Sequence, residues 1–299
     1  MIITIPILNK MDKWAQWVTV KRFGGDKKIA EANLEKLGQV RDRILHNAHI
    51  IPGNTVIDVG AGDGLLAFGA LKLVESTGKV IFVDISQDLL NSCEAFCRDD
   101  LKAENTEFIR ASAEDLSMIP SDSADAIVAR AVHLYVVDKA KCFKQYYRIL
   151  RKDGSLSIYE PDNSFYAKLI EGKKMYFGLD FEPLGKLGDK VLEYFRYPPD
   201  FVNDPMLNYD SRVLYNLVQR AGFRGLSVDN YSSIRSEIKL PPWDIFIKIA
   251  MNPTFPTLAD VMNDLTPEES KQIEACLKPQ VENTKVSQPF AEIYLHGVK

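Results

Sequence analysis

The sequence predicts an α/β fold in which helices cover both faces of a mostly parallel sheet. An apolar run at residues 55–59 leads into a glycine turn at 60–64, a second apolar run ends at Asp84, and strand-like and helix-like segments alternate as far as Pro161. Buried parallel strands have nearly continuous apolar sequences, and their connections are right-handed crossovers. We therefore expect a doubly wound open sheet with a ligand site at the carboxyl ends of its strands.

The first strand–helix–strand unit contains a compact glycine turn. Gly60, Gly62 and Gly64 allow the chain to bend sharply after the first strand and leave bare backbone for a ligand to lie against. A helix-like segment follows at 65–74, and the carboxylate of Asp84 comes about twenty residues after the turn, where it can accept hydrogen bonds from two ribose hydroxyls. The unit predicts a site for a nucleoside-type cofactor.

The glycine turn departs from the dinucleotide-binding pattern. In that pattern the third glycine comes one residue later, at the position of Leu65, and the helix amino-terminus faces a pyrophosphate. Asp58 and Asp63 instead place negative charge at the turn. Acidic groups favour a cofactor that carries a sulfonium and an ammonium and has no phosphate. The turn thus favours S-adenosylmethionine, with an NAD-linked oxidoreductase as the alternative.

With these residues the chain resembles the class I S-adenosylmethionine-dependent methyltransferases, in particular the subgroup that includes ubiquinone/menaquinone and small-metabolite enzymes. The resemblance covers residues 53–161. It implies a Rossmann-like sheet of seven strands whose last strand, at 291–298, is antiparallel. The segment 150–161 is similar to the family's turn into the fifth strand, although residues 151–153 replace the usual proline and first glycine.

The resemblance also implies which residues hold the cofactor. The glycine turn and Asp84 support it, the segment 111–116 meets the adenine, and the end of the fourth strand passes under the methionine part. The residues expected to bind S-adenosylmethionine are Asp58, Gly60, Ala61, Gly62, Asp84, Ile85, Ala113, Glu114 and Arg130.

Methyl transfer from a sulfonium is an in-line displacement, so an enzyme mainly positions the acceptor and removes a proton where necessary. The catalytic candidates at the ends of strands four and five are Glu160, His133 and Tyr159. His133 has the pKa range of a base at neutral pH, and its alternative role is packing against the cofactor. Glu160 is able to accept a proton or stabilise a cation, and its alternative role is structural.

Residues 162–207 are rich in aromatic side chains and are interrupted by glycine and proline. We interpret them as a cap over the active site that favours a flat or apolar acceptor, because aromatic walls bury apolar area and stack on rings. The residues expected to bind the acceptor are Trp17, Arg22, Tyr135, Phe165, Tyr176 and Phe195.

Two kinds of acceptor stay open. One is an aromatic or polyketide-like compound methylated at oxygen or nitrogen, and the other is an alkene such as a prenyl diphosphate methylated at carbon. A diphosphate would need basic groups at the mouth of the site. Those available are Arg22, Lys168, Lys173, Lys174, Arg196 and Arg212.

The chain is expected to divide into four regions. In the first, Trp14 and Trp17 either close over the cofactor or pack a helix on the sheet. The regions are a lid with flanking helices at 1–52, a cofactor-binding core at 53–161, the cap at 162–207, and a completion of the core at 208–299 with a helical insertion at about 239–287.

Composition excludes some functions. Hydrophobic residues make up 46% of the 299 residues, enough for a core, and the net charge is −4. Nucleic-acid binding requires a clustered basic face, so we expect no such partner. No apolar run is long enough to span a membrane and the amino-terminus lacks a basic leader, so we expect a cytoplasmic protein.

The four cysteines and four histidines form no ligand pattern, so we expect no metal. The expected substrate is a small molecule of secondary metabolism. A homo-oligomer stays open, and so does a catalytically silent cofactor-binding subunit that pairs with an active enzyme.

Overall fold

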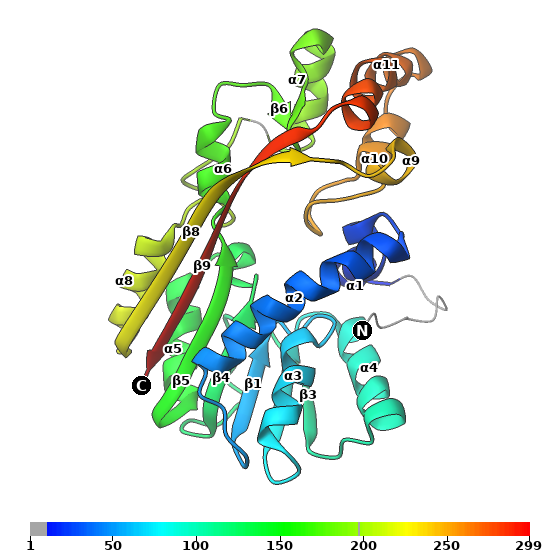
Figure 1. Ribbon diagram of the computed structural model, residues 1–299. Coiled ribbons are helices and arrows are strands. Elements are labelled where there is room, and N and C mark those ends of the chain that lie inside the picture. Colours follow the sequence, from blue (N-terminus) through cyan, green and yellow to red (C-terminus); the bar gives the residue numbers. More distant parts are fainter. Residues whose placement is uncertain (1–10, 197) are drawn as a thin grey trace.

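The computed structural model describes residues 11–196 and 198–299, so the first ten residues of the predicted lid region lie outside this part. One sheet of seven strands forms the centre, in the order β3-β2-β1-β4-β5-β9-β8 (Figure 1). The first five are parallel, and β9 pairs antiparallel with β5 and β8. The strands are β1 (Thr55–Val59), β2 (Lys79–Asp84), β3 (Thr106–Arg110), β4 (Ala124–Arg130), β5 (Leu150–Pro161), β8 (Arg224–Ile238) and β9 (Val286–Val298).

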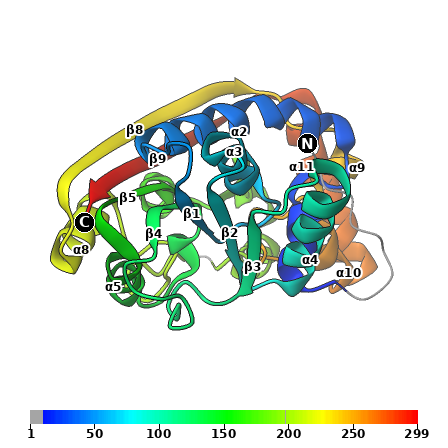
Figure 2. The same ribbon diagram turned by 90° about the horizontal axis from the view of Figure 1, so that it is seen from below.

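Helices cover both faces of this sheet, which confirms the predicted doubly wound fold. On one face α2, α3 and α4 pack against Val56, Phe82 and Val128, and on the other α5 and α8 pack against Ile57 and Ile127. Figure 2 shows α2 and α3 on the side of the sheet opposite α5. These helices are α2 (Lys27–Asn47), α3 (Leu65–Val74), α4 (Gln87–Phe96, continued by a π turn at Cys97–Leu101), α5 (Lys139–Ile149) and α8 (Ser211–Ala221).

Local sequence fixes the ends of several helices. Ser86 caps α4 by accepting from the Leu89 amide, and Asp138 and Asp210 cap α5 and α8 in the same way. Thr266 forms a full capping box with Glu269 at the start of α11.

The two antiparallel strands are longer than their sequences predict. The apolar pattern indicates strands at 224–230 and 291–298, whereas β8 continues to Ile238 and β9 begins at Val286. Beyond the sheet these extensions pair mainly with each other, and residues 230–237 of β8 are all exposed. With no buried face, the extension needs no apolar alternation, so it could not be recognised from hydrophobicity.

A second layer of structure stands above the carboxyl ends of the strands (Figure 1). Residues 162–207 and the insertion after β8 share one hydrophobic core, which includes Phe181, Leu192, Trp243 and Leu277. From here on, the cap means this combined unit, which is larger than the segment 162–207 predicted from the sequence. Its elements are α6 (Asn163–Leu169), β6 (Met175–Tyr176), β7 (Leu179–Asp180), a 3-10 turn (Glu182–Leu184), α7 (Lys186–Glu193), α9 (Trp243–Phe246), α10 (Leu258–Asn263) and α11 (Pro267–Asn283).

The division into four regions stays a prediction, but the shared core shows that the two segments of the cap fold together. Within residues 11–196 and 198–299, no helix is both long and apolar enough to cross a bilayer.

Candidate functional site

A cavity of about 300 Å³ opens at the carboxyl ends of β1, β2 and β4. We call it the loop cavity because the glycine turn forms its floor. All nine residues that the sequence assigns to the cofactor line it, and residues from the amino-terminal segment close it from above. The lining therefore brings the predicted cofactor residues together, while their contacts with a cofactor stay a prediction.

The glycine turn presents bare backbone to this cavity. Gly60 and Gly62 have φ values of 71° and 56°, in the left-handed region that favours glycine. A Cβ built on Gly60 would overlap the side chain of Val132. The Gly62 amide and the Ser86 amide each donate to the Asp84 carboxylate, both at 2.8 Å. Asp84 is thus fixed at the end of β2, and burial raises its pKa.

Asp58 has an unsatisfied oxygen beneath the turn. Its Oδ2 accepts from the Ala67 amide at 2.9 Å, whereas its Oδ1 is buried and has no hydrogen-bond partner in the described structure. Burial raises the pKa of Asp58 to about 7. A buried carboxylate oxygen without a partner favours a ligand that brings a donor or a positive charge. Together with the bare turn, this fits the amino-acid end of S-adenosylmethionine.

The expected adenine segment is held by α5. Cys142 Sγ donates to the Ala113 carbonyl at 2.9 Å, and the Asp138 amide donates to Glu114 Oε1 at 2.8 Å. Glu114 therefore binds the start of α5 as well as lining the loop cavity. Cys142 was not a candidate from the sequence, because nothing in a helical cysteine indicates which carbonyl it will meet.

The amino-terminal lid consists of α1 (Lys13–Thr19) and a 3-10 turn (Lys21–Phe23). Its contacts tie it to the start of α4 on one side and to the cap on the other. Asp12 accepts from the Ser86 hydroxyl at 2.6 Å, Trp17 Nε1 donates to the Ala250 carbonyl at 2.8 Å, and Lys21 pairs with Asp260 at 2.8 Å. Trp14 and Trp17 both line the cavity, while their closure over a cofactor stays a prediction.

A second cavity, of about 380 Å³, lies between the sheet and the cap. We call it the cap cavity. Tyr176 and Phe195 stack in its wall with ring centroids 4.0 Å apart and planes at 15°. Trp17, Ala131 and Tyr135 line both cavities and form what we call the boundary.

Four of the six residues expected to bind the acceptor line the cap cavity: Trp17, Tyr135, Tyr176 and Phe195. Arg22 lines the loop cavity instead, and Phe165 lines neither. Phe165 follows Asp162, the cap of α6, and its position on that short helix turns it away from the cavity that its neighbour Tyr166 lines.

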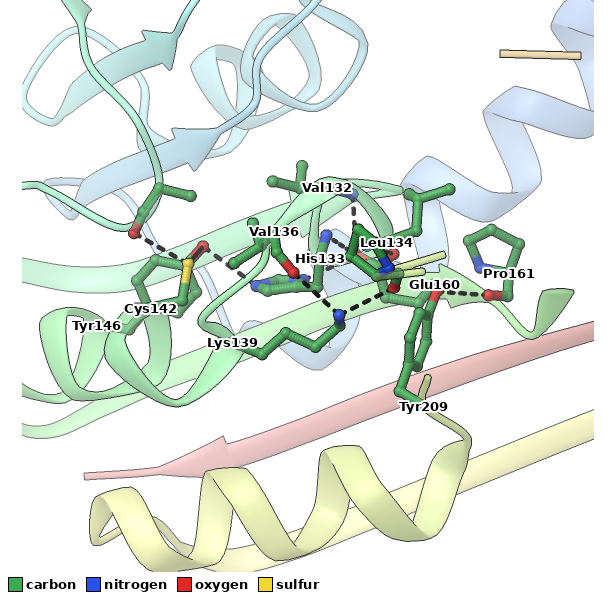
Figure 3. A network of polar contacts seen from close by, with 12 residues as sticks. Val132, His133, Leu134, Val136, Lys139, Cys142, Tyr146, Glu160, Pro161 and Tyr209 are labelled. Carbon is green, nitrogen blue, oxygen red and sulfur yellow. Dashed lines mark hydrogen bonds and ion pairs between the residues drawn. The ribbon is translucent and has the colours of Figure 1, made fainter. Parts of the chain in front are cut away.

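Glu160 and His133 are fully buried, at 0% exposure, and line neither cavity. Glu160 Oε1 accepts from the Val132 and His133 amides, both at 2.9 Å, and lies 2.8 Å from His133 Nδ1. Its Oε2 accepts from the Leu134 amide at 3.3 Å (Figure 3). One carboxylate thus binds three successive amides of the segment that follows β4, next to the boundary. We propose that Glu160 positions this segment.

His133 continues the network away from the cavities. Its Nε2 lies 3.2 Å from the Tyr146 hydroxyl, and its ring stacks on Phe143 with centroids 4.9 Å apart. Tyr159, the third catalytic candidate, packs edge-on against Tyr294 and also lines neither cavity. Burial raises the pKa of Tyr159. Packing, the alternative for His133, fits this setting, with Phe143 rather than a cofactor as the neighbour.

Lys139 joins the same region to the segment that precedes α8. Its ammonium donates to the Val136 carbonyl at 3.0 Å (Figure 3). It also donates to the Pro205 carbonyl at 2.9 Å and to Asn208 Oδ1 at 3.0 Å. Burial lowers the pKa of Lys139 to about 8. Sequence reasoning missed this residue, because a lysine at the start of an amphipathic helix is normally solvated.

Comparison with known proteins places the chain in a family. A profile described as a methyltransferase domain matches residues 50–219, which is more than half of the chain. The ubiquinone/menaquinone biosynthesis C-methyltransferase UbiE of Vibrio vulnificus (strain YJ016) is 30% identical over 182 residues, covering 60% of this chain and 67% of that protein. UbiE of Escherichia coli O1:K1 / APEC is 31% identical over 184 residues, covering 60% and 69%.

Solved structures share the fold. The YcgJ protein from Bacillus subtilis aligns with a TM-score of 0.50 and 16% identity, covering 89% of this chain and 98% of that one. A chain from the complex between the Haloferax volcanii Trm112 methyltransferase activator and a methyltransferase aligns with a TM-score of 0.51 and 12% identity, covering 97% and 98%.

The fold and the loop cavity are those of a class I S-adenosylmethionine-dependent methyltransferase. The chain belongs to the methyltransferase domain family, and S-adenosylmethionine is its cofactor.

Proposed function

We propose that the protein transfers the methyl group of S-adenosylmethionine to a small, largely apolar or aromatic molecule in the cap cavity. The observation that supports this most strongly is the boundary, where Trp17, Ala131 and Tyr135 line both cavities. A methyl group that leaves a sulfur at this place would cross directly from one cavity to the other. In-line transfer requires the two reacting atoms to be held about 3 Å apart, which two adjoining cavities provide.

When bound, the cofactor supplies an activated methyl group on its sulfonium. The protein's own residues bind and orient the reactants. Asp84 would accept the ribose hydroxyls, the unpaired oxygen of Asp58 would bind the ammonium, and Trp17 would close the site from water. Glu160 acts from behind the boundary by fixing the segment after β4.

The described wall of the cap cavity contains two carboxylates, Asp162 and Asp204, and both are partly engaged by neighbouring groups. Asp162 Oδ1 accepts from the Ser164 hydroxyl at 2.6 Å and from the Phe165 amide at 3.1 Å. Asp204 accepts from the Met206 amide at 2.9 Å and pairs with Arg196 at 3.2 Å. We propose an acceptor that is already nucleophilic, or one that loses its proton to water or to Asp162, whose Oδ2 accepts no hydrogen bond from the described residues.

The same wall favours an acceptor without a diphosphate. Of the six basic residues considered for that group, Arg196 lines the cap cavity, and its charge is balanced by Asp204. Arg22 lies in the loop cavity. Methylation of an aromatic or polyketide-like compound is therefore our first candidate, and methylation of a prenyl diphosphate is the second. Cytoplasmic location, a role in secondary metabolism and self-association stay predictions.

The function is tested in two stages with the full-length protein. Calorimetry with S-adenosylhomocysteine should show binding at one site per chain. Radiolabelled S-adenosylmethionine should then label phenols, amines or enols from an acceptor panel, and prenyl diphosphates should stay unlabelled. Labelling of prenyl diphosphates alone would reverse the order of the two candidates. Binding without turnover on any acceptor would favour the silent cofactor-binding subunit.

A further inference from the structure

Two guanidinium groups line the loop cavity without hydrogen-bonding partners. Arg22 comes from the lid and Arg130 from the end of β4. Within residues 11–196 and 198–299 neither group donates a hydrogen bond, and the one carboxylate oxygen within ion-pair distance is Asp63 Oδ2, 4.0 Å from Arg22. Guanidinium groups bring several donors in a fixed plane and are costly to bury unpaired. Their convergence indicates an anionic ligand group.

Arg22 is held in place rather than solvated. Its side chain is 14% exposed. The guanidinium lies 5.5 Å from the ring centroid of Trp17 and 5.1 Å from that of Phe23. Burial and the nearby charge of Arg130 lower the pKa of Arg22 to about 10, so the side chain stays charged at neutral pH while its charge is poorly compensated. A bound anion would offset both the burial of the Arg22 charge and its repulsion by Arg130.

The opposite charges lie on the same floor. Asp58 has a buried oxygen without a partner, and Asp63 belongs to the glycine turn. The loop cavity thus contains two carboxylates and two guanidiniums whose charges act on one another, since Arg130 and Asp63 both influence the pKa of Arg22 and of Asp58. A zwitterion has the matching pair of charges, and the amino-acid end of the cofactor is a zwitterion.

We propose that Arg22 and Arg130 form an anion subsite that binds the α-carboxylate of S-adenosylmethionine. This rests on the assignment of the cofactor and gives Arg22, expected from the sequence to meet the acceptor, a cofactor role. Because one guanidinium belongs to the lid and the other to the sheet, the carboxylate neutralises a repulsion between them. Cofactor binding therefore favours closure of the lid over the boundary.

The test compares two ligands that differ in the carboxylate alone. S-adenosylhomocysteine carries it, and S-adenosyl-3-thiopropylamine keeps the thioether and the amine without it. Calorimetry is performed on the wild type, Arg22→Gln and Arg130→Gln. We expect each substitution to lower the affinity for S-adenosylhomocysteine about 10- to 100-fold, because a charge-assisted hydrogen bond is lost. The affinity for the decarboxylated ligand should stay within about twofold of the wild-type value. Binding of the decarboxylated ligand also shows that each variant is folded.

Lys21→Gln is the matched control, because Lys21 is also on the lid but pairs with Asp260 outside the loop cavity. It should leave the ratio of the two affinities unchanged. The proposal is overturned if Arg22→Gln weakens both ligands equally, which would indicate a general role in the lid. It is also overturned if the variant binds both normally and raises the KM of the acceptor instead. If the wild type binds neither ligand, the assigned function itself fails.

Discussion

The loop cavity and the cap cavity adjoin each other, yet different kinds of residue enclose them. The loop cavity is built from a few short stretches at the ends of β1, β2 and β4, with charged side chains and bare backbone in its wall. The cap cavity is lined by aromatic and aliphatic side chains from segments that are far apart in the chain. Local motifs thus build the cavity proposed for the cofactor, whereas tertiary packing builds the cavity proposed for the acceptor.

The largest effect is expected from a substitution in the glycine turn, on the floor of the loop cavity. Gly60→Ala places a methyl group against Val132 and strains a backbone with φ at 71°. We expect the affinity for S-adenosylhomocysteine to fall at least about 100-fold, as measured by calorimetry. Gly172→Ala is the control, because Gly172 also has positive φ but has open space around it. Wild-type affinity in the Gly60 variant would show that no ligand lies on the turn.

Glu160 distinguishes a positioning role from a catalytic one. Glu160→Gln replaces the carboxylate that accepts from three backbone amides by an uncharged amide group. The free energy of unfolding should therefore fall by about 1–3 kcal/mol. We expect kcat to fall about tenfold with an unchanged pH profile, because the boundary is displaced and no base is lost. Stability is measured by urea unfolding and kcat with the best acceptor.

Glu107 provides the control for Glu160→Gln. Glu107→Gln removes a carboxylate from an ion pair with Lys79 on the edge of the sheet and should change stability by less than about 0.5 kcal/mol. If Glu160 were a general base, kcat would instead fall about 10²- to 10⁴-fold, with stability unchanged and the acidic limb of the pH profile lost.

The charge of Asp58 makes cofactor binding depend on pH. With a pKa of about 7 in the folded protein, Asp58 is mostly protonated at pH 6 and mostly ionised at pH 8. A ligand ammonium prefers the ionised form, so the affinity for S-adenosylhomocysteine should rise about tenfold from pH 6 to pH 8. Calorimetry at both values should show this rise in the wild type and lose it in Asp58→Asn. An equal rise in both proteins would assign the titration to another group.

The raised pKa of Asp58 also makes the stability of the folded protein depend on pH. Because the folded pKa lies above the ordinary value, the folded state binds more protons between about pH 4 and pH 7. The contribution of Asp58 to stability is therefore present at acidic pH and is lost as the pH rises through 7. Without ligand, Asp58→Asn should be more stable than the wild type at pH 8.

The cap cavity offers the smallest expected effect. Phe195→Leu removes the stack on Tyr176 while keeping an apolar side chain, so the KM of the acceptor should rise about three- to tenfold and the affinity for S-adenosylhomocysteine should not change. Phe181→Leu is the matched control, because Phe181 belongs to the core of the cap but does not line the cavity. If both substitutions change KM alike, the effect belongs to the cap as a whole.

Much of the fold and the lining of the loop cavity could be predicted because the relevant signals are local. The strand before Gly60, the turn itself and the carboxylate at Asp84 lie within one unit of the chain, and each has a physical requirement for its residue type. The capping box at Thr266 is a local signal of the same kind, since the cap and its partner Glu269 are three residues apart.

The remaining features depend on contacts between distant segments. The burial of Glu160 results from the segment after β4 folding back over the end of β5, which no single stretch reveals. The contact of Cys142 with Ala113 and the shared core of the two cap segments have the same origin. The extension of β8 escaped prediction for the opposite reason, because its exposed residues lack a hydrophobic pattern.

The central claim is that the two cavities hold the cofactor and the acceptor on either side of the boundary. A crystal structure of the protein with S-adenosylhomocysteine tests it most directly. We predict that the ribose lies on Asp84, the carboxylate lies between Arg22 and Arg130, and the sulfur faces the cap cavity past Ala131. A sulfur directed into solvent, or a glycine turn occupied by a pyrophosphate, would contradict the account.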